Sequence, residues 1–190
     1  MIREQLYDNG FVIVDNFLSE QICKDLRSYA INSRYVEHIY PDYYAVNYYS
    51  NVDCGNQEIS NLVTNVVPNI LIEKYPFLCE NGHEFQRGWY FIHNNHQFQS
   101  VLRHVDPGSY ITANLWVTPD EFKEDNSLDY NGFIIHTPKQ SVTIPYKFNR
   151  LTLFFSQIEH ESQLSKFKSE DKKKKVNFTF LFGSKLDDRI

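Results

Sequence analysis

The second half of the sequence consists of short β-type runs separated by turn residues, and this pattern limits the folds available to the chain. The runs are rich in Val, Ile, Phe, Tyr and Thr, the residue types that favour strands. Seven or eight short strands with turn signals between them are typical of a β-sandwich or a jelly roll closed on itself. The expected strands cover residues 85–92, 98–105, 110–117, 132–136, 141–145, 150–156 and 176–182.

The first 80 residues have a different pattern, in which helices dominate. Residues 1–10 suggest a short helix that ends at Gly10, and residues 11–15 a brief strand. Ser19 is a good N-cap for an amphipathic helix, and another helix is expected over 56–67, ending before Pro68. We therefore predict an α+β, mainly β fold: a double-stranded β-helix (jelly roll, cupin-like barrel) buttressed by N-terminal helices.

Length and charge narrow the class of protein. The chain has 190 residues, near the usual size of one domain, so we expect a single domain over 1–190, with helical support and a lid in 1–80 and a jelly-roll core in 84–183. A net charge of -5 makes nucleic acid an unlikely partner, and no apolar run is long enough to span a membrane. Three cysteines without CxxC spacing indicate neither a disulfide framework nor a zinc knuckle. We expect a soluble, cytoplasmic protein, and predict no oligomeric state.

His104 and Asp106 form an HxD tripeptide at the end of an expected strand. On an extended strand, side chains two residues apart point to the same face, so the two could bind one metal ion. With 7 His and 12 Asp in the chain, chance alone gives about 0.4 such tripeptides, so its position carries the argument. The strand stops at Pro107-Gly108, where a barrel mouth would lie, and His160 follows another β-type run. Together the three would make a two-histidine, one-carboxylate facial triad, which suits non-haem Fe(II).

Lys175 opens the last strong strand of the sequence. By strand alternation Lys175, Asn177 and Thr179 share one face, while the opposite face is apolar. A cation among polar neighbours suits a pocket inside a barrel, whereas the preceding lysines fit a solvated turn. A lysine in such a pocket could bind the far carboxylate of a 2-oxoglutarate co-substrate through a charge-assisted hydrogen bond.

The order of HxD, distal His and basic residue resembles the Fe(II)- and 2-oxoglutarate-dependent dioxygenases, and more narrowly the prolyl-4-hydroxylase-like oxygenases of phage and bacterial type. The resemblance covers most of the chain. The similar blocks are Asn9-Gly-Phe-Val-Ile-Val-Asp-Asn-Phe-Leu-Ser19, Asn114-Leu-Trp-Val-Thr-Pro-Asp120, Asn131-Gly-Phe-Ile-Ile135, Asn149-Arg-Leu-Thr-Leu-Phe154 and Lys174-Lys-Val-Asn-Phe-Thr-Phe-Leu-Phe-Gly183. Lys stands where the commoner residue is Arg, and keeps the charge without the bidentate fork.

The resemblance implies a site and cofactors. His104, Asp106 and His160 would bind Fe(II), and Lys175 would bind the distal carboxylate of 2-oxoglutarate, with O2 as the oxidant. Asn114 and Tyr90 are further candidates for contacts to 2-oxoglutarate. The implied reaction is hydroxylation of an unactivated C–H bond with release of succinate and CO2, because related halogenases lack the carboxylate that Asp106 supplies.

Other interpretations stay open. The same triad also fits desaturation, cyclisation or demethylation, and a jelly roll can instead be a non-catalytic binding protein. The substrate could be an amino acid, a peptidyl residue or a small metabolite. The Tyr-rich segment 35–49 and the loop 118–131 are candidates for the lid that selects it.

Overall fold

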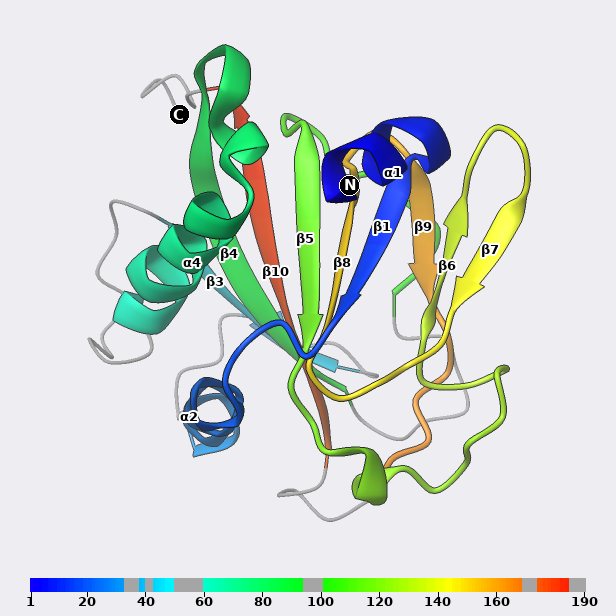
Figure 1. The fold of residues 1–190 in the computed structure, drawn as a ribbon. Coiled ribbons are helices and arrows are strands. Elements are labelled where there is room, and N and C mark those ends of the chain that lie inside the picture. Colours follow the sequence, from blue (N-terminus) through cyan, green and yellow to red (C-terminus); the bar gives the residue numbers. More distant parts are fainter. Residues whose placement is uncertain (33–37, 40–42, 50–59, 94–100, 169–173, 185–190) are drawn as a thin grey trace.

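Two antiparallel sheets face each other in the structure, a computed structural model (Figure 1). It describes residues 1–32, 38–39, 43–49, 60–93, 101–168 and 174–184, with only the backbone of 38–39 and 43–49. Side chains from both sheets meet in one apolar cluster, in which Trp116 and Phe154 of the large sheet pack with Phe133 of the small sheet. This is the double-stranded jelly roll expected from the succession of short strands.

The large sheet has seven strands in the described residues. Their spatial order is β1 (Phe11–Asp15), β8 (Arg150–Phe155), β5 (Ile111–Trp116), β10 (Lys175–Ser184), β4 (His83–His93), β3 (Tyr43–Tyr49) and β2 (His38–Ile39). The N-terminal part of the chain thus supplies strands to both edges of this sheet in addition to helices. The predicted division into a helical support over 1–80 and a β core after it was too simple. The edge strands β1, β2 and β3 come from the first 80 residues, whereas the central strands of the same sheet come from the second half of the chain.

The small sheet has the order β7 (Ser141–Ile144), β6 (Phe133–His136) and β9 (Glu159–Ser162). The sequence did not indicate β9 as a separate strand. Its Glu-His-Glu-Ser sequence has no apolar alternation, and the strand forms because it pairs with β6 in the register Ile135↔His160. Tertiary pairing therefore overrides a weak local preference here.

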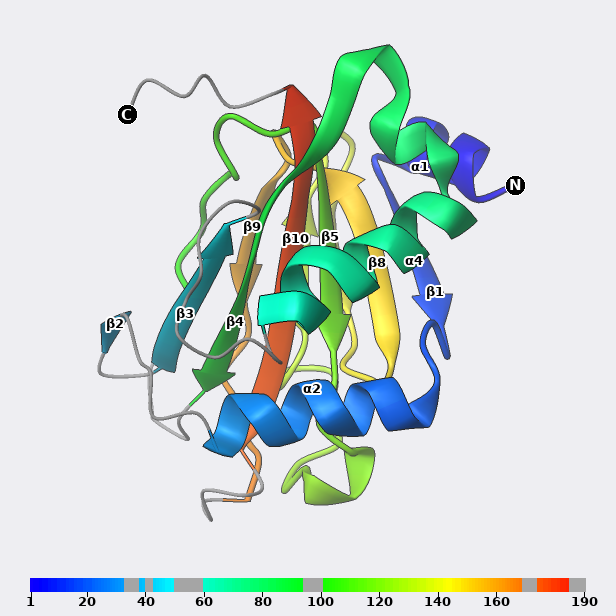
Figure 2. The ribbon, with the colours of Figure 1, turned by 90° about the vertical axis from the view of Figure 1, so that its left-hand side faces the viewer.

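Helices α1 (Ile2–Asn9), α2 (Glu20–Asn32) and α4 (Val67–Lys74) accompany the large sheet. Figure 2 shows α2 and α4 crossing the face of that sheet that is turned away from the small sheet. The predicted helix over 1–10 is confirmed, and its last residue is followed by Gly10 at φ 83°, a left-handed conformation that favours glycine. Ser19 caps α2 as expected, because its Oγ accepts a hydrogen bond from the backbone N–H of Ile22 at 3.3 Å. No helix in the described ranges is long and apolar enough to cross a membrane.

Of the helix expected over 56–67, residues 56–59 lie outside the described residues, and the rest continues through Pro68 to Lys74, so the predicted end was wrong. A π-helical turn, η1 (Leu62–Val66), precedes α4, and the N–H of Val67 donates to the carbonyl of Leu62. A proline has no N–H to donate, and the switch from π to α geometry is a point where the regular hydrogen-bond ladder is already interrupted. Pro68 is therefore accommodated at this junction.

The two faces of β10 have different environments, as the alternation predicted. Val176, Phe178 and Phe180 are fully buried in the cluster between the large sheet and the helices. Lys175, Asn177 and Thr179 face the other way and line a pocket between the sheets. The remaining short elements, η2 (Pro76–Gly82) and η3 (Asp120–Phe122), connect the larger ones.

Candidate metal centre

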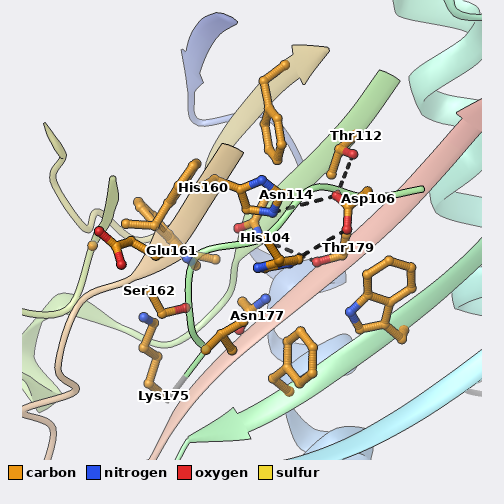
Figure 3. Close-up of a pocket in the computed structure, with 17 residues that line it drawn as sticks. His104, Asp106, Thr112, Asn114, His160, Glu161, Ser162, Lys175, Asn177 and Thr179 are labelled. Atoms are coloured by element: carbon orange, nitrogen blue, oxygen red, sulfur yellow. Dashed lines mark hydrogen bonds and ion pairs between the residues drawn. The ribbon is translucent and has the colours of Figure 1, made fainter. Parts of the chain in front are cut away.

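A pocket between the two sheets contains the residues singled out by the sequence. The space between its walls is about 490 Å³, counting the part open to solvent. Figure 3 shows its polar side chains. The lining residues are Trp89, Phe91, Val101, His104, Asp106, Thr112, Asn114, Trp116, Gly132, Phe133, Phe154, His160, Glu161, Ser162, Lys175, Asn177 and Thr179.

His104, Asp106 and His160 converge at one end of this pocket. The Nε2 of His104 lies 3.8 Å from Asp106 Oδ1, and the Nε2 of His160 lies 3.7 Å from Asp106 Oδ2 (Figure 3). All three candidate ligand atoms lie within 4.8 Å of one another. Ligand atoms about 2.1 Å from a common metal, at right angles to each other, are about 3 Å apart, so small side-chain shifts would complete a facial triad.

A short backbone pairing brings the two histidines together. The N–H of His104 donates to the carbonyl of His160 at 2.9 Å, and the N–H of His160 donates back at 2.8 Å. Of the strand expected over 98–105, residues 98–100 lie outside the described residues and 101–105 form only this isolated bridge, so that prediction was too long. The bridge needs β9, which the sequence did not reveal.

Both imidazole rings are held with Nε2 free to bind a metal. The Nδ1 of His104 donates to the carbonyl of Leu102 at 2.7 Å, and the Nδ1 of His160 to that of Ile158 at 3.1 Å. A hydrogen bond from one ring nitrogen to a carbonyl fixes the tautomer that leaves a lone pair on the other nitrogen. Both histidines therefore have the orientation that a metal ligand requires.

Asp106 is held by the hydroxyl group of Thr112, which the sequence reasoning missed, and Ser156 contacts that hydroxyl in turn. Its Oδ2 accepts a hydrogen bond from Thr112 Oγ1 at 2.7 Å, and Thr112 Oγ1 lies 2.9 Å from Ser156 Oγ. The backbone N–H of Asp106 donates to the carbonyl of Ser156 at 2.9 Å. Alternation along β5 was the available signal, because Thr112 shares a face with Asn114.

The environment of His160 favours the neutral imidazole. Its ring packs against Phe154, with ring centroids 4.7 Å apart, and its side chain is 12% exposed. Burial lowers the pKa of His160, and the nearby Asp106 carboxylate opposes this shift. A metal binds the neutral ring, so the lowered pKa keeps His160 in the form that a metal needs.

Lys175 lies at the other end of the pocket, where it is almost fully buried. Its side chain is 2% exposed, and its Nζ lies 5.8 Å from the ring centroid of Trp116 and 5.9 Å from that of Tyr146. Within the described residues, no carboxylate is within ion-pair distance of Nζ, and burial lowers the pKa of Lys175 to about 7. A buried cation without an anionic partner is unfavourable, so this end of the pocket suits an anionic ligand.

Neutral polar groups surround Lys175 and connect it to the metal end. His93, opposite Lys175 in the β4–β10 register, places its Nε2 2.5 Å from Asn177 Oδ1, and burial lowers the pKa of His93 to about 3, so the ring stays neutral. Asn114 Nδ2 donates to Thr179 Oγ1 at 3.3 Å, while its Oδ1 has no hydrogen-bond partner among the described residues. Asn114 thus lies in the pocket, as expected.

Tyr90 is not part of the pocket lining. It is fully buried in the cluster between the large sheet and the helices, where its ring packs against Phe178 at 5.3 Å. On β4 the neighbouring residues Trp89 and Phe91 face the pocket instead. The expected contact to a co-substrate is therefore wrong for Tyr90, because adjacent residues of a strand point to opposite faces.

No protein-family model and no curated protein sequence matches this chain. Solved structures do match it, and they share one architecture. The chain has the jelly-roll fold of the 2-oxoglutarate- and Fe(II)-dependent oxygenases.

Three of these structures illustrate the likeness. A prolyl-4-hydroxylase from Pseudomonas putida matches with a TM-score of 0.66 and 14% identity over 97% of this chain and 98% of its own. HygX from Streptomyces hygroscopicus, with nickel, 2-oxoglutarate and hygromycin B bound, has a TM-score of 0.65 and 10% identity over 96% and 86%. A prolyl hydroxylase from Trichoplax adhaerens in complex with a hypoxia-inducible-factor peptide fragment has a TM-score of 0.62 and 18% identity over 96% of this chain and 87% of its own.

Proposed function

We propose that this protein is an Fe(II)- and 2-oxoglutarate-dependent oxygenase. The observation that carries the proposal is that one pocket holds both a His-Asp-His cluster and a buried lysine with no carboxylate partner among the described residues. A metal site alone would fit many activities. An additional anion site at the opposite end of the same pocket fits a chelating dicarboxylate.

His104, Asp106 and His160 are the residues that would hold the metal. Three protein ligands leave the remaining positions of a six-coordinate ion open, and Fe(II) is the metal for which this donor set is typical. Bound together, Fe(II) and 2-oxoglutarate would supply an oxidising power that protein side chains lack, consuming O2 and releasing succinate and CO2. Asp106 occupies the third ligand position, which favours hydroxylation as the outcome.

Lys175 would bind the far carboxylate of 2-oxoglutarate. An incoming carboxylate would raise the pKa of Lys175 from its low value, because an opposite charge nearby favours the ammonium form. Asn177, Thr179 and Asn114 line the route between Lys175 and the metal end, and offer hydrogen bonds along it. Lysine is a single point charge, so these neighbours would help to orient the ligand.

Aromatic walls would keep water away from the site. Phe133, Phe154 and Trp116 line the pocket, and each is at most 6% exposed. A dry pocket strengthens the electrostatic attraction between Lys175 and a carboxylate. It would also keep solvent away from the position of the substrate that is oxidised.

The substrate proposed is an amino acid, a peptidyl residue or a small metabolite. Support comes from the similar folds, one of which was solved with a peptide fragment and another with hygromycin B. One fold can host many chemistries, so the proposed function is argued from the site. The type of oxidation is inferred from the presence of Asp106, and the class of substrate from the residues of the pocket walls.

The test is an anaerobic titration with Fe(II), followed by measurement of succinate formed from 2-oxoglutarate in air. We expect the wild-type protein to bind about one Fe(II) and to turn over 2-oxoglutarate slowly without substrate, and we expect His104→Ala to lose both. His83→Ala is the matched control, because His83 packs against Tyr110 and does not line the pocket. If the wild type binds no Fe(II), or if His104→Ala keeps metal binding and turnover, the protein is a non-catalytic jelly roll or another kind of enzyme.

A further inference from the structure

Trp89 has a hydrogen-bond donor that no residue in the described part of the chain satisfies. It lies on β4, lines the pocket and is 9% exposed, yet its indole Nε1 has no hydrogen-bond partner. Buried indole N–H groups usually have a partner, because leaving one unpaired costs the loss of its hydrogen bond to water. A ligand oxygen in the pocket would supply the missing acceptor.

Trp89 lies beside the metal end of the pocket. In the sheet register it is opposite Thr179, which is in turn opposite Asn114, and Thr112, which holds Asp106, is two residues before Asn114 on β5. Lys175 is four residues before Thr179 on β10, or about 13 Å at the rise of an antiparallel strand. A molecule that contacts Trp89 would therefore lie near the metal and away from Lys175, where a substrate has to lie.

Arg87 adds a positive charge at the same place. It precedes Trp89 by two residues on the same face of β4, and its guanidinium carbon is 5.3 Å from the centroid of the Trp89 ring. No carboxylate within the described ranges is at ion-pair distance from Arg87. Stacking on the indole orients the guanidinium and leaves its N–H edges free to bind a carboxylate.

Two acidic residues line the pocket in the part of the chain that the structure describes, and neither is directed at the Trp89 side as an unpaired charge. The acidic residues of the lining are Asp106, which belongs to the metal cluster, and Glu161. Glu161 pairs with His136 at 3.1 Å, and Figure 3 shows its carboxylate directed away from His104 and Asp106. The Trp89 side of the pocket is therefore polar, and Arg87, which lies beside Trp89 but outside the lining itself, adds a positive charge.

We infer that the substrate carries a carboxylate, which Arg87 and the Trp89 indole N–H recognise. This inference rests on the proposed function and deepens it, since it assigns Lys175 to the co-substrate and Arg87 with Trp89 to the substrate. An amino acid or a peptide with a free carboxylate next to the oxidised position fits this site. A substrate without an anionic group would not bind to Arg87 and Trp89 in this way.

The chain offers two built-in reporters for the test, because Trp89 and Trp116 are its only tryptophans. Trp116 lies beside Lys175 and reports on 2-oxoglutarate, while Trp89 reports on the substrate. The experiment follows the two indole N–H resonances of 15N-tryptophan-labelled protein loaded with diamagnetic Zn(II) and 2-oxoglutarate, assigned with Trp89→Phe. The probes are matched pairs, N-acetyl amino acids and the corresponding amides, at up to millimolar concentration.

We expect 2-oxoglutarate to shift the Trp116 resonance, and the acids but not the amides to move the Trp89 resonance downfield. Arg87→Gln should weaken binding of the acids at least tenfold, while Arg3→Gln, which removes an exposed arginine paired with Glu80, should leave it unchanged. Three results would overturn the inference while the Trp116 resonance still responds to 2-oxoglutarate. The Trp89 resonance could fail to shift with any acid, or it could shift equally with the amides. Alternatively, the acids could bind Arg87→Gln as tightly as the wild type. A Trp116 resonance that ignores 2-oxoglutarate overturns the proposed function as well.

Discussion

The Thr112 hydroxyl, on β5 of the large sheet, donates a hydrogen bond of 2.7 Å to Asp106 Oδ2. Asp106 itself follows an isolated bridge and belongs to no regular strand. The orientation of the carboxylate therefore depends on β5. The Thr112 hydroxyl is in turn within hydrogen-bond distance of the hydroxyl of Ser156, which directly follows β8. The large sheet thus orients Asp106 through Thr112, while His160 comes from β9 of the small sheet and His104 from the isolated bridge beside it.

Thr112→Val should weaken metal binding without removing a ligand. Valine has nearly the same shape but cannot donate to Asp106, so the carboxylate gains freedom to rotate. Partners of this kind typically contribute about 10- to 100-fold to metal affinity. Isothermal titration with Co(II) under anaerobic conditions measures the change, and Thr143→Val on β7 serves as a control outside the pocket lining. An unchanged affinity in Thr112→Val would show that the hydrogen bond does not position Asp106.

Lys175→Met should weaken 2-oxoglutarate binding far more than metal binding. The substitution keeps most of the length of the side chain and removes the only lysine or arginine charge among the lining residues. A lost charge-assisted hydrogen bond in a buried site costs about 1.5–3 kcal/mol, or about 10- to 150-fold in affinity. Lys175→Arg should recover part of it. Lys139→Met, at an exposed position, is the control, and equal affinities in Lys175→Met and the wild type would contradict the proposed anchor.

The stability of the ligand-free protein should depend on pH through Lys175. Its folded-state pKa of about 7 lies below the ordinary value of 10.5, so the charged form destabilises the folded state. This cost is fully present below about pH 7 and diminishes as the pH rises from there towards 10.5, where the unfolded chain also loses the proton. Urea unfolding of wild type and Lys175→Met should show the variant more stable at pH 6, with the difference shrinking by about 1.4 kcal/mol per pH unit above 7. A difference that is constant between pH 6 and 9 would argue against a buried ammonium.

Gly132→Ala should destabilise the small sheet. An added Cβ at Gly132 would collide with the carbonyl oxygen of Ile144 and lie 2.8 Å from Gln163 Oε1, so β6 and β7 would have to move apart. Overpacking of this kind typically costs about 1–3 kcal/mol, and Gly132 also lines the metal pocket. Chemical denaturation followed by circular dichroism should place the midpoint below that of wild type, whereas Lys139→Ala in the exposed turn should leave it unchanged. Wild-type stability in Gly132→Ala would mean that the small sheet adjusts freely.

Strand alternation predicted which side chains of β10 face the pocket, because period-two patterning is a local property of the backbone. Lys175, Asn177 and Thr179 all lie where the pattern placed them. On β4 alternation groups Trp89 with Phe91 and Tyr90 with Ile92, but both faces are apolar, so the pattern does not say which face meets the pocket. The packing of Tyr90 between the large sheet and the helices decides it.

The sequence alone determined the mainly β class and the helices at the start of the chain, which follow from the local signals of composition, alternation and capping. The three candidate metal ligands and Lys175 were predicted from strand alternation together with the resemblance of the motif order to a known family. Only the tertiary structure decided that His160 lies beside His104, that Thr112 orients Asp106 and that Trp89 with Arg87 borders the metal end. These relationships join segments far apart in the chain, and they form because sheet closure satisfies backbone hydrogen bonds that no single segment can satisfy by itself.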